Sequence, residues 1–380
     1  MKKFFSVILL FLLIAAGVYF FTNPAIMIKE IEVQDIYIND MGIENDIYYY
    51  EMLDDTQKKY YRIIAQGVMN LKENITMEIT KDKNYEEYRN NVEISLNAFL
   101  ADHPEVFFVN DGYEVSLIDG LVVKILKLKL NYISNDIEEI DKMEDELKKE
   151  INEISEKTRY YESEYEKEIF IHDSIAESLS YYEYENYEDI PSIKHTAYGA
   201  LVEGSAVCDG ITKAFQLVLA KANIDSIFVT GTTDEVAHAW NKVKIDGDYY
   251  NVDLTSNKTL GRDNNSLVIH SYFNITDEEI LNTHTIDKNE NLPKCIATKY
   301  NYYLYNDYEI TFMDSFEYKL ESIVDSQKSK GLIEIRIIGI SDTPSELITG
   351  LYNINFNNYK TNNITKVKYH KVNDNYIIVK

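Results

Sequence analysis

Two alternating segments on either side of an Asp-Gly pair constrain the fold of this chain more than any other feature of its sequence. The segments are 237-AHAWNKVKI-245 and 248-DYYNVDLTS-256, and the pair is Asp246-Gly247. An Asp-Gly connection of this length favours a tight turn between two antiparallel strands. The sequence therefore predicts a hairpin, and with it an antiparallel sheet in this part of the chain.

The register of this hairpin decides which side chains meet. If Ile245 pairs with Asp248, then Asp253 lies opposite Trp240 and diagonal to His238. Successive residues of a strand alternate between faces, so this register keeps the side chains of His238 and Asp253 on one face of the sheet. The other face is then apolar, with Val243, Ile245, Tyr250, Val252 and Leu254.

A cysteine precedes a run with helical apolar spacing in 204-GSAVCDGITKAFQLVLAKANI-224. A thiol is nucleophilic only as the thiolate, and a reference pKa of about 8.5 leaves little of that form at neutral pH. A helix that begins near Val207 would place Cys208 at its N-terminus, where unpaired N–H groups and the helix dipole favour negative charge. Gly204 and Gly210 leave backbone room beside the sulfur, so they are candidates for the substrate cleft.

Cys208, His238 and Asp253 together suggest acyl transfer by a thiol. A carboxylate on one imidazole nitrogen sets the tautomer, so that the other nitrogen can take the proton of a thiol. Each residue alone has a more ordinary interpretation: a buried structural cysteine, a structural histidine on a strand, or an aspartate at a turn. Their combination favours the catalytic interpretation.

A family resemblance rests on several segments of this region. They are 195-HTAYGALVEGSAVCDGITKAFQLVLAKANI-224, 229-VTGT-232, 237-AHAWNKVKIDGDYYNVDLT-255 and 272-YFNITDEE-279, with further matches in 170-FIHDSIAESLSYY-182 and 102-DHPEVFFV-109. They resemble the transglutaminase-like superfamily as it occurs in bacterial surface proteins. The resemblance implies a papain-like α+β core in which the cysteine helix packs on an antiparallel sheet. It also implies that Cys208 is the nucleophile, His238 the base and Asp253 the residue that orients it. The segment 255-TSN-257 departs from the common pattern after the aspartate.

The ends of the chain suggest further parts around this core. Residues 1–25 join two lysines to an apolar run of about eighteen residues, near the minimum for a membrane span. We interpret residues 1–22 as a retained membrane anchor, with a cleaved signal as the alternative, and expect the rest of the chain outside the cytoplasm. The remaining parts are a spacer at 23–45, an N-terminal α/β lead-in with an amphipathic helix at 46–160, the catalytic core at 161–300 and a C-terminal α+β domain at 301–380.

Periodicity also predicts individual elements outside the core. Aspartates 54 and 55 are expected to cap a helix that continues to residue 71, and Asp-Gly pairs at 111–112 and 119–120 are expected to form turns of a meander. Helical spacing predicts helices at 135–157, 163–180 and 314–329, and alternation predicts strands at 226–232, 332–340 and 364–372.

The formal net charge of −26 and a pI near 4.7 argue against a nucleic-acid partner, because phosphate binding needs a basic surface that this chain lacks overall. His172, His195, His270 and His284 lack metal-like spacing, so we expect structural or exposed histidines, no metal and no cofactor. Trp240 either walls the cleft or belongs to the core. Cys295 is expected to be a free thiol without a catalytic role.

The expected function is thiol-dependent acyl transfer on a protein or peptide carboxamide, and candidate partners include cell-wall and surface proteins. Water as acceptor would give a peptidase or amidase, and an amine would give crosslinking. The alternative is a non-catalytic surface module that keeps the same fold for binding or wall attachment.

Overall fold

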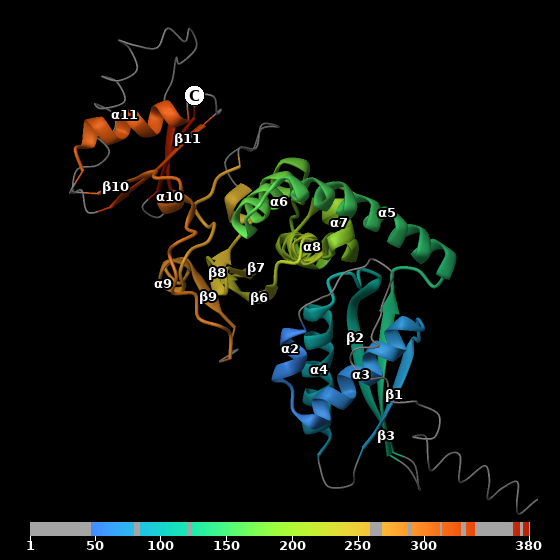
Figure 1. Ribbon diagram of the computed structural model, residues 1–380. Helices are drawn as coiled ribbons and strands as arrows, with labels where there is room; N and C mark the ends of the chain where they lie inside the picture. Colours follow the sequence, from blue (N-terminus) through green and yellow to red (C-terminus); the bar gives the residue numbers. More distant parts are fainter. Residues whose placement is uncertain are drawn as a thin grey trace, which may run out of the picture. The chain divides into compact units, whose positions relative to one another are not determined.

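The computed structural model of the chain is shown in Figure 1. It describes residues 47–79, 84–119, 124–258, 268–287, 291–311, 314–327, 332–338, 368–372 and 375–379. The chain forms two compact units, Met1–Asp145 and Glu146–Lys380. The segment 1–22, which we interpret as an anchor, and the spacer at 23–45 lie outside the described residues. Within those residues, no helix is both long and apolar enough to cross a membrane.

The first unit contains helices and one antiparallel sheet. The helices are α2 (Tyr48–Met52), α3 (Asp55–Met69) and α4 (Tyr85–Asp102), and the sheet has the order β1 (Asn74–Glu78), β3 (Lys124–Tyr132) and β2 (Val109–Asp119). Asp54 caps α3 as expected, because its carboxylate accepts from the Gln57 N–H while the Gln57 side chain accepts from the Asp54 N–H.

The Asp-Gly pair at 111–112 is not a turn, and this prediction was wrong. The pair lies inside β2, where the pairing with β3 shifts between Val109 and Tyr113. Gly112 has a φ of +83°, which suits a bulge in a continuous strand. An Asp-Gly pair therefore forms a hairpin turn at 246–247, whereas the pair at 111–112 lies within one continuous strand. Gly120, of the second pair, lies outside the described residues.

The amphipathic helix predicted at 135–157 is present as α5 (Ile137–Ser155). Its apolar stripe is buried at Ile140, Leu147 and Ile151, whereas Ile137 at its start is exposed. The division between the two units falls inside this helix, at residues 145–146, whereas the predicted core begins at residue 161.

The second unit is built on the sheet that carries the predicted hairpin. The sheet has the order β8 (Asp248–Val252), β7 (Val236–Ile245), β6 (Ser226–Thr233) and β9 (His284–Ile286), and every neighbouring pair is antiparallel. Ile245 pairs with Asp248, so the predicted register is confirmed. The turn residues Asp246 and Gly247 both have positive φ, +49° and +90°, as a tight hairpin turn requires.

Helices cover this sheet. α8 (Cys208–Lys221) packs on β6 and β7, and α6 (Glu164–Ser178) and α7 (Ala197–Leu201) pack against α8 (Figure 1). Apolar residues of α8, among them Ile211, Phe215 and Leu219, are fully buried. Cysteine helix and antiparallel sheet therefore pack as the resemblance implied. Short elements complete this part of the unit: β4 (Ser180–Tyr181), β5 (Ser205–Ala206), α9 (Asp277–Ile280) and the single turns Glu156–Tyr160, Tyr187–Asp189, Ser192–His195 and Ser256–Lys258.

The C-terminal residues form a second sheet in the same unit. Its order is β10 (Glu309–Thr311), β11 (Leu332–Ile338), β13 (Asn375–Val379) and β12 (Lys368–Val372), with α10 (Tyr302–Tyr305) and α11 (Phe316–Ser326) beside it. β10 and β11 are parallel, and the other pairs are antiparallel.

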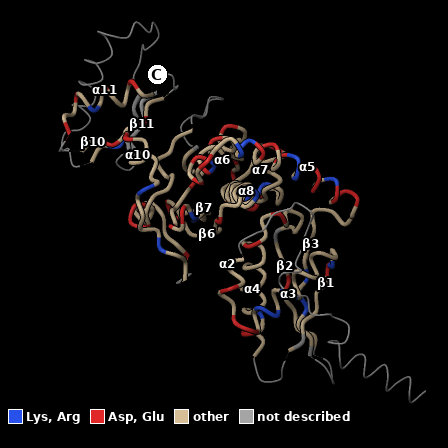
Figure 2. The backbone as a smooth tube through the Cα atoms, in the orientation of Figure 1, with Lys and Arg blue, Asp and Glu red and all other residues tan. Residues whose placement is uncertain are grey.

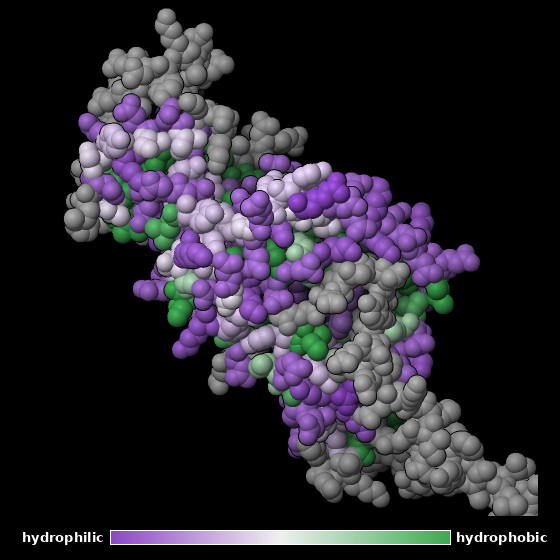
Figure 3. All heavy atoms as spheres, viewed as in Figure 1, coloured by the Kyte–Doolittle hydropathy of each residue, from purple (hydrophilic) through white to green (hydrophobic). Residues whose placement is uncertain are grey.

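Acidic residues outnumber Lys and Arg by 64 to 38. Figure 2 shows them distributed over the described elements of both units rather than gathered in one segment. On the face drawn in Figure 3, most of the described surface is hydrophilic, with scattered apolar residues. This distribution is that of a solvated surface.

Candidate active site

Cys208 is the first residue of α8, and Val207 is its N-cap, as the sequence predicted. The thiol is free and partly exposed. The position of this helix end depends on Gly210, because a Cβ there would lie 2.5 Å from the Lys194 carbonyl oxygen. A side chain at residue 210 would push the first turn away from the segment at 194–196. Gly210 therefore serves packing rather than room for a substrate.

Gly204 occupies a backbone conformation that favours glycine. Its φ of +65° belongs to the left-handed region, and its carbonyl accepts from the Ser180 N–H at 2.8 Å. Next to it, Ser205 and Ala206 of β5 pair with β4. This short parallel pairing supports the loop that leads into Cys208.

His238 and Asp253 meet as the hairpin register predicts. The His238 Nε2 lies 2.8 Å from Oδ2 of Asp253. The Asp253 side chain is completely buried, and His238 has 9% of its surface exposed. The Cys208 side chain interacts with the same imidazole, and this interaction contributes to the raised pKa of His238. Because Nε2 is used by Asp253, Nδ1 is the nitrogen left for the thiol.

The charges of these groups support one another. Burial of the imidazole opposes its charge, but attraction to Asp253, the hydrogen bond to it and the interaction with Cys208 raise the pKa of His238 to about 10. Burial also opposes the charge of Asp253, but His238 and His284 hold the pKa of this carboxyl well below its usual range. His238 is therefore an imidazolium and Asp253 a carboxylate at neutral pH.

Asp253 accepts more hydrogen bonds than the hairpin register predicts. Oδ2 also accepts from His284 Nε2 at 3.0 Å and from Ser256 Oγ at 2.5 Å, and Oδ1 accepts from the Ser256 N–H at 2.9 Å. An Asp three residues before a Ser is a common turn pattern, so Ser256 had a signal in the sequence. His284 had none, because its place depends on the pairing of β6 with β9, in which Thr233 lies opposite His284.

Trp240 is part of the core and does not wall an open cleft. Its side chain is fully buried, and its indole N–H donates to Asn251 Oδ1 at 3.1 Å. The ring stacks beside His238, with centroids 6.3 Å apart, and meets the edge of His284 at 5.1 Å. Trp240 therefore supports both imidazoles from within the unit.

The four other candidate histidines are all buried. In the part of the chain that the structure describes, two groups have donor atoms close enough for a metal ion: His238, Asp253 and His284, and His172, Asp173 and His270. In the first group, both Nε2 atoms already donate to one oxygen of Asp253, so a cation would have to displace these protons. The hydrogen-bonded arrangement satisfies every donor without a metal.

Cys295 lies apart from this site. It is a buried free thiol beside Lys242 and Asp277, and burial raises its pKa to about 12. It therefore remains a protonated, inert thiol at neutral pH.

Comparisons with known proteins address the family. Residues 145–254 match the model of the transglutaminase-like superfamily, and this range includes Cys208, His238 and Asp253. No curated protein matches the chain. Among solved structures, a TGase matches with 16% identity over 50% of this chain and 52% of its own, at a TM-score of 0.28. A candidate cysteine protease from Cytophaga hutchinsonii matches with 13% identity over 38% of this chain and 62% of its own, at a TM-score of 0.25. A candidate protease from Parabacteroides distasonis matches with 15% identity over 37% and 36%, at a TM-score of 0.22. The chain thus spans less than two thirds of each of these structures. As the sequence resemblance implied, the chain contains a core of the transglutaminase-like superfamily, over residues 145–254.

Proposed function

We propose that the protein is a thiol acyltransferase or hydrolase in which Cys208 attacks a carboxamide or peptide carbonyl. The observation that carries this proposal is the shared imidazole: His238 lies 2.8 Å from Asp253, and it also interacts with Cys208. A partly exposed thiol at a helix N-terminus, paired with a charged imidazole, is the arrangement that nucleophilic cysteines need.

The reaction follows from these groups. The Cys208 thiolate, paired with the His238 imidazolium, attacks the carbonyl carbon, and the C–N bond breaks as the imidazolium gives its proton to the leaving nitrogen. The product is a thioester on Cys208 and a neutral His238. His238 then takes a proton from water or from an amine, which attacks the thioester, and the C–S bond breaks to return the Cys208 thiolate and the His238 imidazolium. Water gives hydrolysis, and an amine gives transfer.

The substrate class and location belong to the same proposal. A protein or peptide supplies the carboxamide, and the surface position expected from residues 1–22 makes cell-wall and surface proteins the candidate partners. Protease added to intact cells should digest the chain from outside. If the protease digests the chain only after lysis, the proposed location is wrong, but the proposed reaction of Cys208 is not tested by this result.

Alkylation with iodoacetamide across pH tests the proposed chemistry. Cys208 should react at pH values where ordinary thiols are slow, and Cys208→Ala should abolish both this labelling and thioester formation with a glutamine peptide. Cys295 is an internal control, because burial keeps it protonated and inaccessible. Turnover retained in Cys208→Ala would refute the nucleophile. A folded protein whose Cys208 labels only at alkaline pH would point instead to a binding module.

A further inference from the structure

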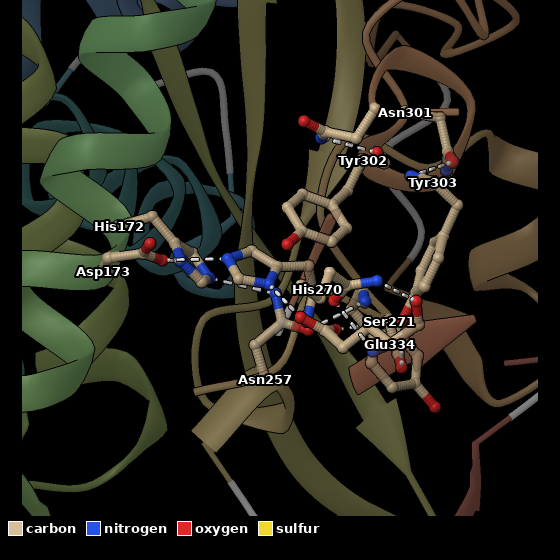
Figure 4. A network of polar contacts seen from close by, with 12 residues as sticks. His172, Asp173, Asn257, His270, Ser271, Asn301, Tyr302, Tyr303 and Glu334 are labelled. Carbon is tan, nitrogen blue, oxygen red and sulfur yellow. Dashed lines mark hydrogen bonds and ion pairs between the residues drawn. The ribbon is translucent and has the colours of Figure 1, made fainter. Parts of the chain in front are cut away.

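A series of polar contacts, buried except at the half-exposed Asp173, runs from the turn after Asp253 to strand β11 of the C-terminal sheet (Figure 4). Asn257 is its first link. The Asn257 N–H donates to the Asp253 carbonyl at 3.1 Å, and its Oδ1 accepts from the Tyr272 N–H at 2.8 Å. A backbone N–H can only donate, so this contact fixes the orientation of the amide. The Nδ2 of Asn257 must then donate to His172 Nε2, which lies 3.0 Å away.

The Asn257 amide also decides the state of His172. Since His172 Nε2 accepts, its proton is on Nδ1, which donates to Asp173 Oδ1 at 2.9 Å. Burial lowers the pKa of His172, so it is neutral. A metal ion on Nδ1 would move the proton to Nε2, where it would face the amide N–H of Asn257. The amide therefore favours a hydrogen-bonded chain over a metal site at His172, Asp173 and His270.

His270 continues the chain between two carboxylates. Its Nε2 lies 2.9 Å from Asp173 Oδ1, and its Nδ1 lies 2.8 Å from Glu334 Oε1. Both nitrogens face acceptors, so both carry protons and the ring is an imidazolium. The ring stacks on Tyr302, with centroids 3.9 Å apart.

Glu334 is the last residue of this series of polar contacts, and like Asn257 at its start it makes several hydrogen bonds. Only 1% of its surface is exposed. Its Oε2 accepts from the His270 N–H at 2.8 Å and from the Tyr303 hydroxyl at 3.1 Å. Glu334 belongs to β11, which lies outside the matched range 145–254. A buried carboxylate from the C-terminal sheet is thus built into the support of the core.

We propose that Glu334 is a positioning residue for the active site, which acts through His270, Asp173, His172 and Asn257 on the turn that holds Asp253. This inference rests on the proposed function. The turn matters because Ser256, next to Asn257, donates to both oxygens of Asp253. Any displacement of Asn257 therefore moves two of the donors that hold the orienting carboxylate. C-terminal residues beyond the matched core then belong to the working enzyme.

Glu334→Gln tests this inference in the full chain. The glutamine keeps the shape of the side chain, but its NH2 group must take the place of one carboxylate oxygen. It would then face either the backbone N–H of His270 or the Nδ1–H of the His270 ring, and both are donors. Glu321→Gln, an exposed position on α11, is the matched control. We expect Glu334→Gln to lower kcat about tenfold with little change in KM, as is typical when a partner that orients a functional group is lost. Glu321→Gln should leave both kcat and KM unchanged.

The decisive readout is the titration of His238, followed by NMR with isotope-labelled histidine. It should move downward in Glu334→Gln and not in Glu321→Gln, because a displaced Asp253 stabilises the imidazolium less. A folded Glu334→Gln protein with unchanged His238 titration and kcat would overturn the inference. If that variant unfolds, Tyr303→Phe removes a single donor from Glu334, and the same two measurements decide in the same way. The His238 titration does not depend on turnover, so a wild type without Cys208-dependent activity would refute the proposed function alone.

Discussion

Asp253→Asn perturbs the candidate site at the point where most of its contacts converge. The carboxylate receives three donors on Oδ2, from His238, His284 and Ser256, and the Ser256 N–H on Oδ1. An asparagine has one accepting oxygen. If that oxygen takes the position of Oδ2, the new amide group faces the Ser256 N–H, and the reverse placement leaves three donors facing an amide. The substitution therefore removes a charge and also leaves a donor unpaired.

The magnitude follows from these two effects. An unpaired buried donor costs about 1–3 kcal/mol of unfolding free energy. Without the carboxylate, the burial that opposes charge on His238 is no longer offset by its main attraction, so the His238 pKa should fall from about 10 to below 7. Each pKa unit corresponds to about 1.4 kcal/mol, so the imidazolium loses roughly 4 kcal/mol of stabilisation. Acyl transfer at neutral pH should then slow by roughly two to four orders of magnitude.

Three measurements check this prediction. Single-turnover thioester formation gives the rate, NMR gives the His238 titration, and urea unfolding gives the stability. Asp248→Asn is the control, because Asp248 lies in the same hairpin with an exposed side chain. Unchanged turnover together with an unchanged His238 titration in Asp253→Asn would show that another group orients the histidine.

The remaining predictions concern a buried acid and the second histidine. Burial raises the pKa of Glu168 to about 8, above an unfolded value of about 4.3, so this group makes the fold less stable as pH rises from about 4 to 8. Asn274 Nδ2 donates to Glu168 Oε2 at 2.7 Å, and within the described residues neither Glu168 Oε1 nor Asn274 Oδ1 has a partner. Glutamine at residue 168 keeps an oxygen that can accept from Asn274 and does not ionise. Glu168→Gln should therefore raise the free energy of unfolding by about 2–4 kcal/mol at pH 8 and little at pH 4. Equal pH dependence of urea unfolding in both proteins would contradict this. His284→Phe removes one donor from Asp253, so the Asp253 pKa should rise and activity should be lost at a higher pH on acidification. His284→Gln keeps an N–H donor at this position, so its pH–rate profile should lie between those of wild type and His284→Phe. If the two variants behave alike, the donor at residue 284 has no role in catalysis.

The parts of the site that could be predicted depend on local rules. An Asp-Gly turn sets the hairpin register, and alternation then brings His238 to Asp253. The start of α8 at Cys208 follows from the change to helical spacing after Val207. Each of these steps uses residues close in sequence, where turn and strand geometry leave few choices.

The missed parts depend on pairings between distant segments. His284 reaches Asp253 only because β9 pairs with β6, and Glu334 reaches His270 only because the C-terminal sheet packs on the segment at 268–273. Neither contact leaves a pattern in the sequence. Local rules also failed at Gly112, where β2 continues to pair with β3, after a shift in register, past a strong turn signal. Continued pairing with a neighbouring strand outweighed the turn preference there.

The crowding of donors around Asp253 has a consequence for the proposed reaction. His238 must release its proton to the leaving nitrogen, and at that moment Asp253 loses the charge of its main partner. An isolated buried carboxylate would then tend to take up a proton. Here His284, the Ser256 hydroxyl and the Ser256 N–H still donate to its two oxygens. Asp253 can therefore keep its charge while His238 changes state, and the imidazole regains its proton from the attacking water or amine rather than sharing one with the carboxylate.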